Sequence, residues 1–267
     1  MNRTIPKLAP LHVILGLCLC AAVAQSASGP KELTHAAQLV FRGTIQKVEA
    51  SNLEIVQADS GVAVVRVDEV LKTAPSLGDL TGREITVKLA QPGDATPGEQ
   101  AVFFTNGWLY GKTLAVVEVG RLHGDAALLR GQVAGAASQA ADGELQGRLA
   151  GAEVVVAGRV VETHPAAVVV EVGEGSEHDP QWWEAVVQVD AVFLGKAAGQ
   201  RVTFFYPTSQ DVVWFEAPKP AVGADGIWLL YRDQLPELGL PGYTALKPWN
   251  VLPRGQANRV RRLLLGQ

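Results

Sequence analysis

A short phrase of this sequence is written twice. The stretch VVRVDEVLK at residues 64–72 returns as VVQVDAVFLGK at residues 186–196. Three further blocks match in the same order: LVFRGTI at 39–45 with VVVAGRV at 154–160, GREITV at 82–87 with GQRVTF at 199–204, and PGEQAVFF at 97–104 with VGADGIWL at 222–229. The offset between matching blocks drifts slightly, which indicates a duplicated domain whose loops have changed length. Two copies predict a tandem rather than a solenoid.

Each matching block has the pattern of a β-strand. Stretches such as VFRGTIQKV and ITVKLA mix β-branched and polar residues at a period of two. Glycine and proline punctuate the short gaps between them. Short strands with few helices are typical of a small antiparallel barrel or sandwich, so we predict an all-β chain with minor α content.

The repeated phrase contains a change of phase. Val65 and Val67 point to one side of the expected strand, yet the apolar residues resume at Val70, one position late. A one-residue slip is what a β-bulge produces, and we predict a bulge at Asp68–Val70 and a second one near Asp190–Val192. Bent strands help a small sheet curl and close. The alternative, that the two aspartates are a functional pair, is disfavoured because one carboxylate per domain is a poor acid–base device.

The N-terminus has the pattern of an export signal. Basic Arg3 and Lys7 precede a short apolar run at residues 11–23, and AVA at 22–24 fits a cleavage site. We therefore predict a signal peptide at residues 1–24. The alternative, an uncleaved anchor, is disfavoured because a membrane span needs about 20 apolar residues.

Cysteine usage and charge narrow the class of protein. Cys18 and Cys20 are the only cysteines, so the chain after the leader would contain no disulfide, no thiol nucleophile and no cysteine metal ligand. The net charge is −4 without a basic block, which argues against a nucleic-acid partner. We expect a secreted or periplasmic bacterial protein with no stable membrane span once the leader is removed.

The domain boundaries follow from the repeat. We place the first β-barrel domain at residues 32–121 and the second, with an amphipathic C-terminal helix, at residues 151–267. Residues 122–150 between them are rich in alanine and glycine. Since each glycine costs about 1 kcal/mol inside a helix, we predict a linker with a short helix there.

The blocks GTIQKV, VVRVDEVLK, GREITV and PGEQAVFF, with their second-copy counterparts, carry a family resemblance. The arrangement resembles a family of exported bacterial proteins with OB-like barrels. It is distantly similar to the inhibitory domain of tissue inhibitors of metalloproteinases and to netrin modules. The resemblance implies two tandem small antiparallel OB-like β-barrels with short flanking helices. Those inhibitors chelate zinc through an N-terminal cysteine, so their mechanism does not carry over to a mature chain without cysteine.

Catalytic signatures are missing from the sequence. It has no phosphate loop, no dinucleotide fingerprint and no G-x-S-x-G nucleophile elbow. The histidines after the leader do not fall at metal-ligand spacings. We expect no catalytic residue, no metal and no cofactor.

Candidate ligand-binding residues lie where the two copies differ. Glu177 and Asp179 lie in an acidic loop. The alternative interpretations of this loop are a solvated hairpin tip and a set of calcium ligands. Trp182 and Trp183 follow it, and Trp214 borders a proline-containing loop; exposed indoles can stack on sugars or anchor a protein, whereas buried ones only pack the core.

These residues support three hypotheses about function. The leading one is a non-enzymatic binding or envelope-associated protein that binds another protein. The second is recognition of an envelope glycan through the three tryptophans. The third is a hydrolase built from the carboxylates of residues 171–184.

Overall fold

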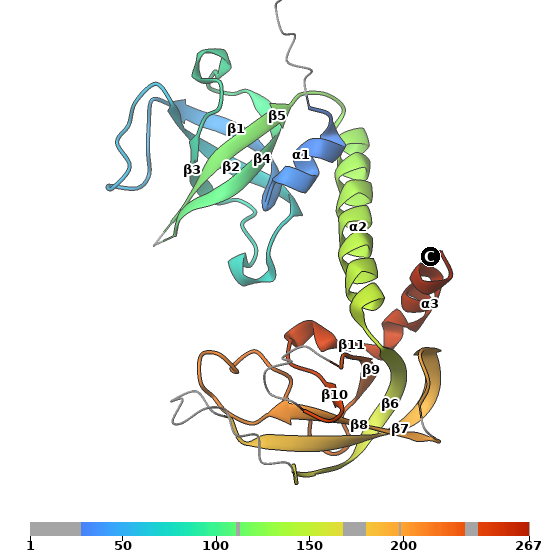
Figure 1. The fold of residues 1–267 in the computed structure, drawn as a ribbon. Coiled ribbons are helices and arrows are strands. Elements are labelled where there is room, and N and C mark those ends of the chain that lie inside the picture. The colour runs from blue at the N-terminus through green and yellow to red at the C-terminus, as the bar shows by residue number, and fades with distance from the viewer. Residues whose placement is uncertain (1–27, 111–112, 168–179, 198, 233–239, 267) are drawn as a thin grey trace, which may run out of the picture.

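The computed structural model describes residues 28–110, 113–167, 180–197, 199–232 and 240–266 (Figure 1). The predicted signal peptide and the candidate residues Glu177 and Asp179 lie outside them. The strands are β1 (Leu39–Val48), β2 (Val62–Lys72), β3 (Glu84–Lys88), β4 (Gln100–Tyr110), β5 (Leu114–Leu122), β6 (Val154–Pro165), β7 (Trp182–Leu194), β8 (Arg201–Pro207), β9 (Asp225–Leu230), β10 (Tyr243–Thr244) and β11 (Val251–Leu252). The helices are α1 (Pro30–Ala36), α2 (Ala126–Gly151) and α3 (Ala257–Leu265), with short 3-10 turns that include η1 (Pro75–Leu77) and η4 (Pro248–Asn250). The prediction of a mostly β chain with minor α content is confirmed.

The first module is a closed barrel of five strands. Its order is β1-β2-β3-β5-β4, and β4 pairs back onto β1. All neighbours are antiparallel except β3 and β5. Phe41 and Phe103 stack inside the ring with their centroids 5.3 Å apart. Alternating apolar residues of the strands fill the barrel, as the period-two pattern predicts.

The predicted bulges are confirmed in both modules. Asp68 of β2 is the extra residue between the partners of Arg42 and Gly43 on β1. Asp190 of β7 is the extra residue at the equivalent place opposite β6. Two more irregularities of the β1–β2 register recur at matching positions of β6–β7. The duplication therefore preserves the local twist of the long strand pair as well as its sequence.

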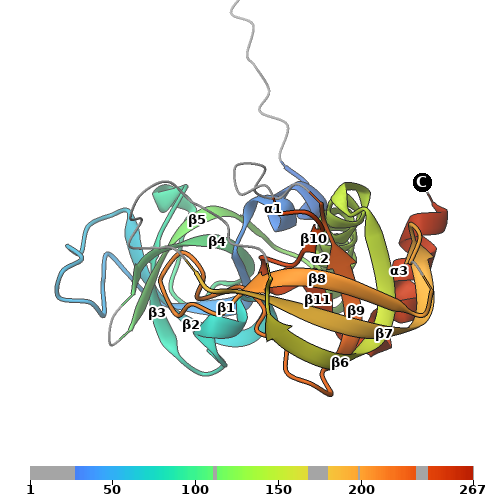
Figure 2. The same cartoon turned by 60° about the horizontal axis from the view of Figure 1, so that its bottom comes forward.

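The second module is a six-stranded sheet that curls as half a barrel, in the order β10-β8-β7-β6-β9-β11 (Figure 2). Tandem barrel-like modules are confirmed, but only the first is a closed ring. β10 runs parallel to β8 as β5 does to β3, and β11 pairs with β9 as β5 does with β4. β10 and β11 are thus two pieces of the fifth strand. Residues 245–250 separate them, and proline in that segment cannot donate a ladder hydrogen bond.

The segment between the modules corrects a prediction. It is one continuous helix, α2, of 26 residues rather than a linker with a short helix. Leu129 and Val133 pack against the first barrel, while Leu145 and Leu149 pack against the second sheet. At about 100° per residue, Leu145 lies roughly 160° around the helix from Leu129. The two apolar stripes face opposite sides, so no single amphipathic face runs through the sequence.

Helix α2 serves both modules. It packs with α1 over the outer face of the first barrel, and its last turns pack with α3 over the second sheet. Arg259 of α3 donates to Asp142 of α2 at 2.6 Å, which ties the C-terminal helix to the bridge. Figure 1 shows α2 running from one module to the other without a break. Over the described residues, no helix has both the length and the apolar character needed to cross a bilayer.

The glycines of α2 give a first prediction. An added Cβ at Gly143 or Gly147 would meet no atom within 4 Å. Because glycine loses more conformational freedom than alanine in a helix, Gly143→Ala and Gly147→Ala should each raise the free energy of unfolding by about 0.5–1 kcal/mol. Urea denaturation followed by circular dichroism measures the change.

The control for this prediction is Gly124, which precedes α2 with a φ of +143°. Alanine is strained in that conformation, so Gly124→Ala should destabilise the protein. Destabilisation by both helix substitutions would contradict a solvent-exposed, continuous α2.

Candidate functional site

The structure brings two of the three candidate tryptophans together. Trp182 is buried, with 8% of its surface exposed, and packs with Phe205 and Leu246. Trp214 meets it edge-on, with ring centroids 5.7 Å apart and an interplanar angle of 73°. Trp183 is partly buried and packs against the core on the other face of β7. The structure thus joins Trp182 to Trp214 and places Trp183 apart from them.

The tryptophan pair supports a loop between β8 and β9. We call residues 209–219 of this connection the apolar loop. It displays three large apolar side chains to solvent: Val212 is 84% exposed, Val213 54% and Phe215 66%. Trp214 turns inward between them onto Trp182. The loop therefore has an anchored inner side and an apolar outer side.

Hydrogen bonds fix the first turn of the apolar loop. The Ser209 hydroxyl accepts from the amide of Asp211 at 3.0 Å, and the Asp211 carboxylate accepts from the amide of Val213 at 2.9 Å. The amide of Trp214 donates to the carbonyl of Asp211 at 2.9 Å, and that of Ala217 to the carbonyl of Trp214 at 3.0 Å. These contacts are the turn chemistry expected of serine and aspartate.

Lys219 holds the second half of the same loop. Its ammonium donates to the carbonyls of Trp214 at 2.9 Å, Phe215 at 3.2 Å and Ala217 at 3.2 Å. Three carbonyls match the three N–H donors of a lysine. The backbone beneath the exposed side chains is therefore ordered in advance, and little conformational entropy remains to be lost when a partner covers them.

Sequence reasoning pointed to Trp214 in this loop but not to the side chains around it. Val213 and Phe215 flank Trp214 in the stretch DVVWFE, and Glu216 adds an exposed carboxylate. A run of four apolar residues in a proline-containing loop was the available signal. Large apolar residues are expected to be buried, so this run does not by itself predict an exposed surface.

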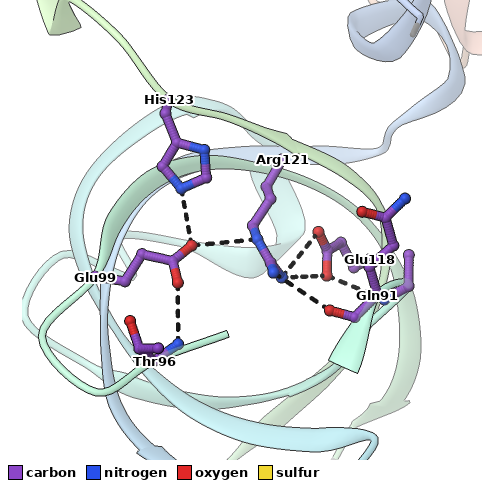
Figure 3. A network of polar contacts seen from close by, with 7 residues as sticks. Gln91, Thr96, Glu99, Glu118, Arg121 and His123 are labelled. Atoms are coloured by element: carbon purple, nitrogen blue, oxygen red, sulfur yellow. Dashed lines mark hydrogen bonds and ion pairs between the residues drawn. The ribbon is translucent and has the colours of Figure 1, made fainter. Parts of the chain in front are cut away.

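The first module contains a different feature, a network of buried charges (Figure 3). The Glu118 and Arg121 side chains are 2% and 7% exposed, and Arg121 contacts Glu118 at 3.2 Å. Arg121 also contacts Glu99 at 3.3 Å, and His123 contacts Glu99 at 2.8 Å from a largely exposed position. Figure 3 shows Arg121 between the two carboxylates.

The two carboxylates of this network titrate differently. Burial raises the pKa of Glu118, although the Ala90 amide at 3.0 Å and Arg121 pull it down. Burial opposes ionisation of Glu99 as well. There the Thr96 amide, His123 and Arg121 prevail, and the pKa of Glu99 lies below its ordinary value. Both carboxylates are committed to internal partners, so the network serves to hold β5 and its flanking loops together.

The described residues offer no cluster of three or more histidine, cysteine, aspartate or glutamate side chains placed to hold a metal ion. A comparison with protein-family models gives no match, and a comparison with curated proteins gives no significant match. The class that the fold defines is a pair of tandem barrel-like modules joined by a shared helix. Within this architecture, the exposed side chains of the apolar loop are the feature that suggests a binding function.

Proposed function

We propose that the protein is a non-enzymatic binding protein of the cell envelope and that it binds another protein through the apolar loop. One observation carries the proposal: Val212, Val213 and Phe215 are exposed side by side on a backbone that is already fixed by hydrogen bonds. Ordered apolar side chains in contact with water are typical of binding sites. Burying a phenylalanine side chain contributes about 1.5–3 kcal/mol.

The charges around the loop favour a protein over a lipid surface. Asp211 and Glu216 flank the exposed side chains, and the whole chain has a net charge of −4. Anionic membrane surfaces attract basic segments, not acidic ones. Phe215 at the centre of a preordered loop is instead the kind of aromatic anchor that fills a pocket on a protein partner.

The positions of Trp182 and Trp214 disfavour the carbohydrate alternative. A sugar stacks on an open aromatic face. Trp182 is buried, and Trp214 turns its ring toward it.

We further propose that residues 1–24 direct export and that the two modules are related to the OB-like barrels of exported bacterial proteins, with a more distant likeness to the tissue-inhibitor and netrin modules. The closed order β1-β2-β3-β5-β4 and the recurrent bulges at Asp68 and Asp190 support the relationship. N-terminal sequencing of the protein from its native host tests the leader. A mature chain that begins near Gln25 is the expected result.

Phe215→Ser tests the proposed interface. A protein captured from a cell-envelope extract would be purified, and its affinity measured by calorimetry for the native chain and the variant. We expect Phe215→Ser to weaken binding about tenfold or more, as the loss of an interface anchor does. The thermal stability should stay unchanged because Phe215 is 66% exposed. The matched control is Ile55→Ser, an equally apolar and 76% exposed position in the first module, which should bind normally.

Three results would contradict the proposal. Equal affinity of Phe215→Ser and the native chain would remove the loop from the interface. Binding to anionic phospholipid vesicles that is lost in Phe215→Ser would assign the loop to a membrane. Saturable binding on a glycan array would favour the carbohydrate alternative.

A further inference from the structure

A cleft of about 980 Å³ lies between the first barrel and helix α2. Its walls come from the end of β2, the turn η1, the ends of β4 and β5, and the helix. They include Leu39, Lys72, Leu77, Tyr110, Leu114 and Glu144. An adjoining hollow of about 500 Å³ shares Leu77, Tyr110 and Leu114 with it. Volumes of this size hold a small organic molecule.

Lys72 supplies a positively charged group to this cleft. Its ammonium donates to the carbonyls of Thr34 at 2.7 Å and Ala37 at 2.6 Å, at the C-terminal end of α1. Within the described part of the chain, these two acceptors use two of the three N–H donors, and the third is left for another acceptor. Burial lowers the pKa of Lys72, while Glu144 acts in the opposite direction. The ammonium is thus fixed in place and partly stripped of water.

The negative charge that lines the cleft is more strongly screened than the charge of Lys72. Among the described residues that line it, Lys72 and Glu144 are the charged ones. The Glu144 side chain is 70% exposed and pairs with Arg148 at 3.2 Å, so solvent and its partner screen it. The part of the cleft next to Lys72 therefore favours an anionic group.

The rest of the lining is uncharged: Leu39, Leu77, Leu114 and Val116 supply its apolar side chains, and Gln38, Thr73 and Ser76 its polar ones. Leu39 and Leu114 belong to the barrel core and are 1% and 8% exposed, so the cleft reaches the mouth of the barrel. Tyr110 folds back so that its hydroxyl occupies the space where a Cβ on Gly107 would lie. The buried Thr113 hydroxyl, at the wall of the adjoining hollow, has no hydrogen-bond partner among the described residues.

We propose that this cleft binds a small amphiphilic carboxylate. The carboxylate accepts a hydrogen bond from the Lys72 ammonium, and the apolar body lies against Leu77 and Leu114 beneath the Tyr110 ring. Charge-assisted hydrogen bonds are strongest in such partly dehydrated positions. The site is separate from the apolar loop, and its test does not depend on whether the loop binds a protein partner.

The duplication restricts this site to the first module. Lys72 pairs with Val40, and Leu194 pairs with Val155 at the matching place in the second module. The matching strand position thus carries a partly buried ammonium in one copy and an aliphatic side chain in the other. The two copies of the phrase end in Lys72 and Lys196 in the sequence, but Lys196 lies beyond the end of β7.

The test compares octanoate with octylamine, two probes of equal chain length and opposite charge, by calorimetry below their aggregation limits. We expect the native chain to bind octanoate about tenfold or more tightly than octylamine. Lys72→Met should abolish the preference, and Glu144→Lys should increase the affinity for octanoate. Lys88→Met is the matched control: this lysine lies 5.3 Å from the Trp108 ring, away from the cleft, and the preference should persist.

Glu144→Lys keeps the test decisive if Lys72→Met fails to fold, because Glu144 is an exposed side chain whose hydrogen bond, among the described residues, is to Arg148 of the same helix. Equal binding of both probes, a preference that survives in Lys72→Met, or an unchanged octanoate affinity in Glu144→Lys would each overturn the proposal. Gly107→Ala adds a readout of the aromatic wall, since it displaces Tyr110 and should weaken both probes alike.

Discussion

Replacing Gly158 with alanine is expected to destabilise the second module by about 3 kcal/mol, the upper end of the usual range for overpacking. An added Cβ would lie 2.6 Å from the Cγ1 atom of Val187 and even closer to the carbonyl oxygen of Gln188. A backbone atom cannot move aside as a flexible side chain can. The carbonyl of Gly158 also accepts a buried hydrogen bond from the Trp228 indole at 3.1 Å, so a backbone shift would disturb two contacts.

The duplication provides the matched variant. At Gly43 of the first module, a Cβ would lie 2.7 Å from Val65 Cγ1 and 2.8 Å from the carbonyl oxygen of Arg66. All tryptophans except Trp108 lie in the second copy, so indole fluorescence follows chiefly that module. Gly158→Ala should shift the fluorescence transition in urea, and Gly43→Ala should shift mainly the loss of circular dichroism.

Gly93 is the control for both substitutions. It lies in an exposed turn where a Cβ meets nothing within 4 Å, so Gly93→Ala should change the free energy of unfolding by less than about 0.5 kcal/mol. Native stability in Gly158→Ala would mean that β6 and β7 do not approach each other as closely as described.

The internal repeat makes the bulges and several turns predictable from the sequence. A period-two pattern that slips in both copies at the same place specifies a bulge, and Asp68 and Asp190 are the bulged residues. Matching glycines mark matching turns: Gly98 and Gly223 have φ values of 86° and 92°. Local backbone requirements of this kind are encoded in a few adjacent residues, so one sequence suffices to find them.

Helix α2 was not predictable in the same way. The periodicity of a surface helix is visible when one face packs against one core. Here Leu129 and Leu145 serve different cores on roughly opposite sides, and interspersed glycines lower the helix propensity further. Tertiary packing at both ends overrides a weak local preference.

The arrangement of the candidate site could not be predicted from the sequence either. The pairing of Trp182 with Trp214 joins β7 to the apolar loop, and nothing in either neighbourhood of the sequence specifies the other. The outward direction of Phe215 follows from that anchor, since the loop backbone is set by Trp214 beneath it. Exposure is a property of the assembled structure, whereas the presence of apolar residues in a loop is a property of the sequence.

Replacing Arg121 with methionine is expected to destabilise the first module by about 3–5 kcal/mol at neutral pH. The change leaves Glu118, 2% exposed, and Glu99, 12% exposed, without the cation between them. Removing one partner of a buried ion pair leaves an uncompensated charge, which is the costly case. The control is Arg66→Met, which removes a 48% exposed guanidinium from its pair with Asp68 and should cost less than about 1 kcal/mol.

The pH dependence identifies which charge causes this loss. Burial raises the pKa of Glu118 above its ordinary value, so the folded state binds the proton more readily than the unfolded chain, and removal of Arg121 strengthens that difference. The stability deficit of Arg121→Met should therefore shrink as the pH falls from 7 toward 4.5. Below pH 4.5 Glu99, whose pKa is lowered, loses its stabilising contribution, and the free energy of unfolding of the native protein falls as well.

Adding Glu118→Gln to Arg121→Met should restore much of the stability at pH 7, because the glutamine side-chain oxygen can still accept from the Ala90 amide. Hydrogen exchange of the β5 amides measures each step, and a deficit that grows on acidification, or a double variant no more stable than Arg121→Met, would show that the buried charge of Glu118 is not its source.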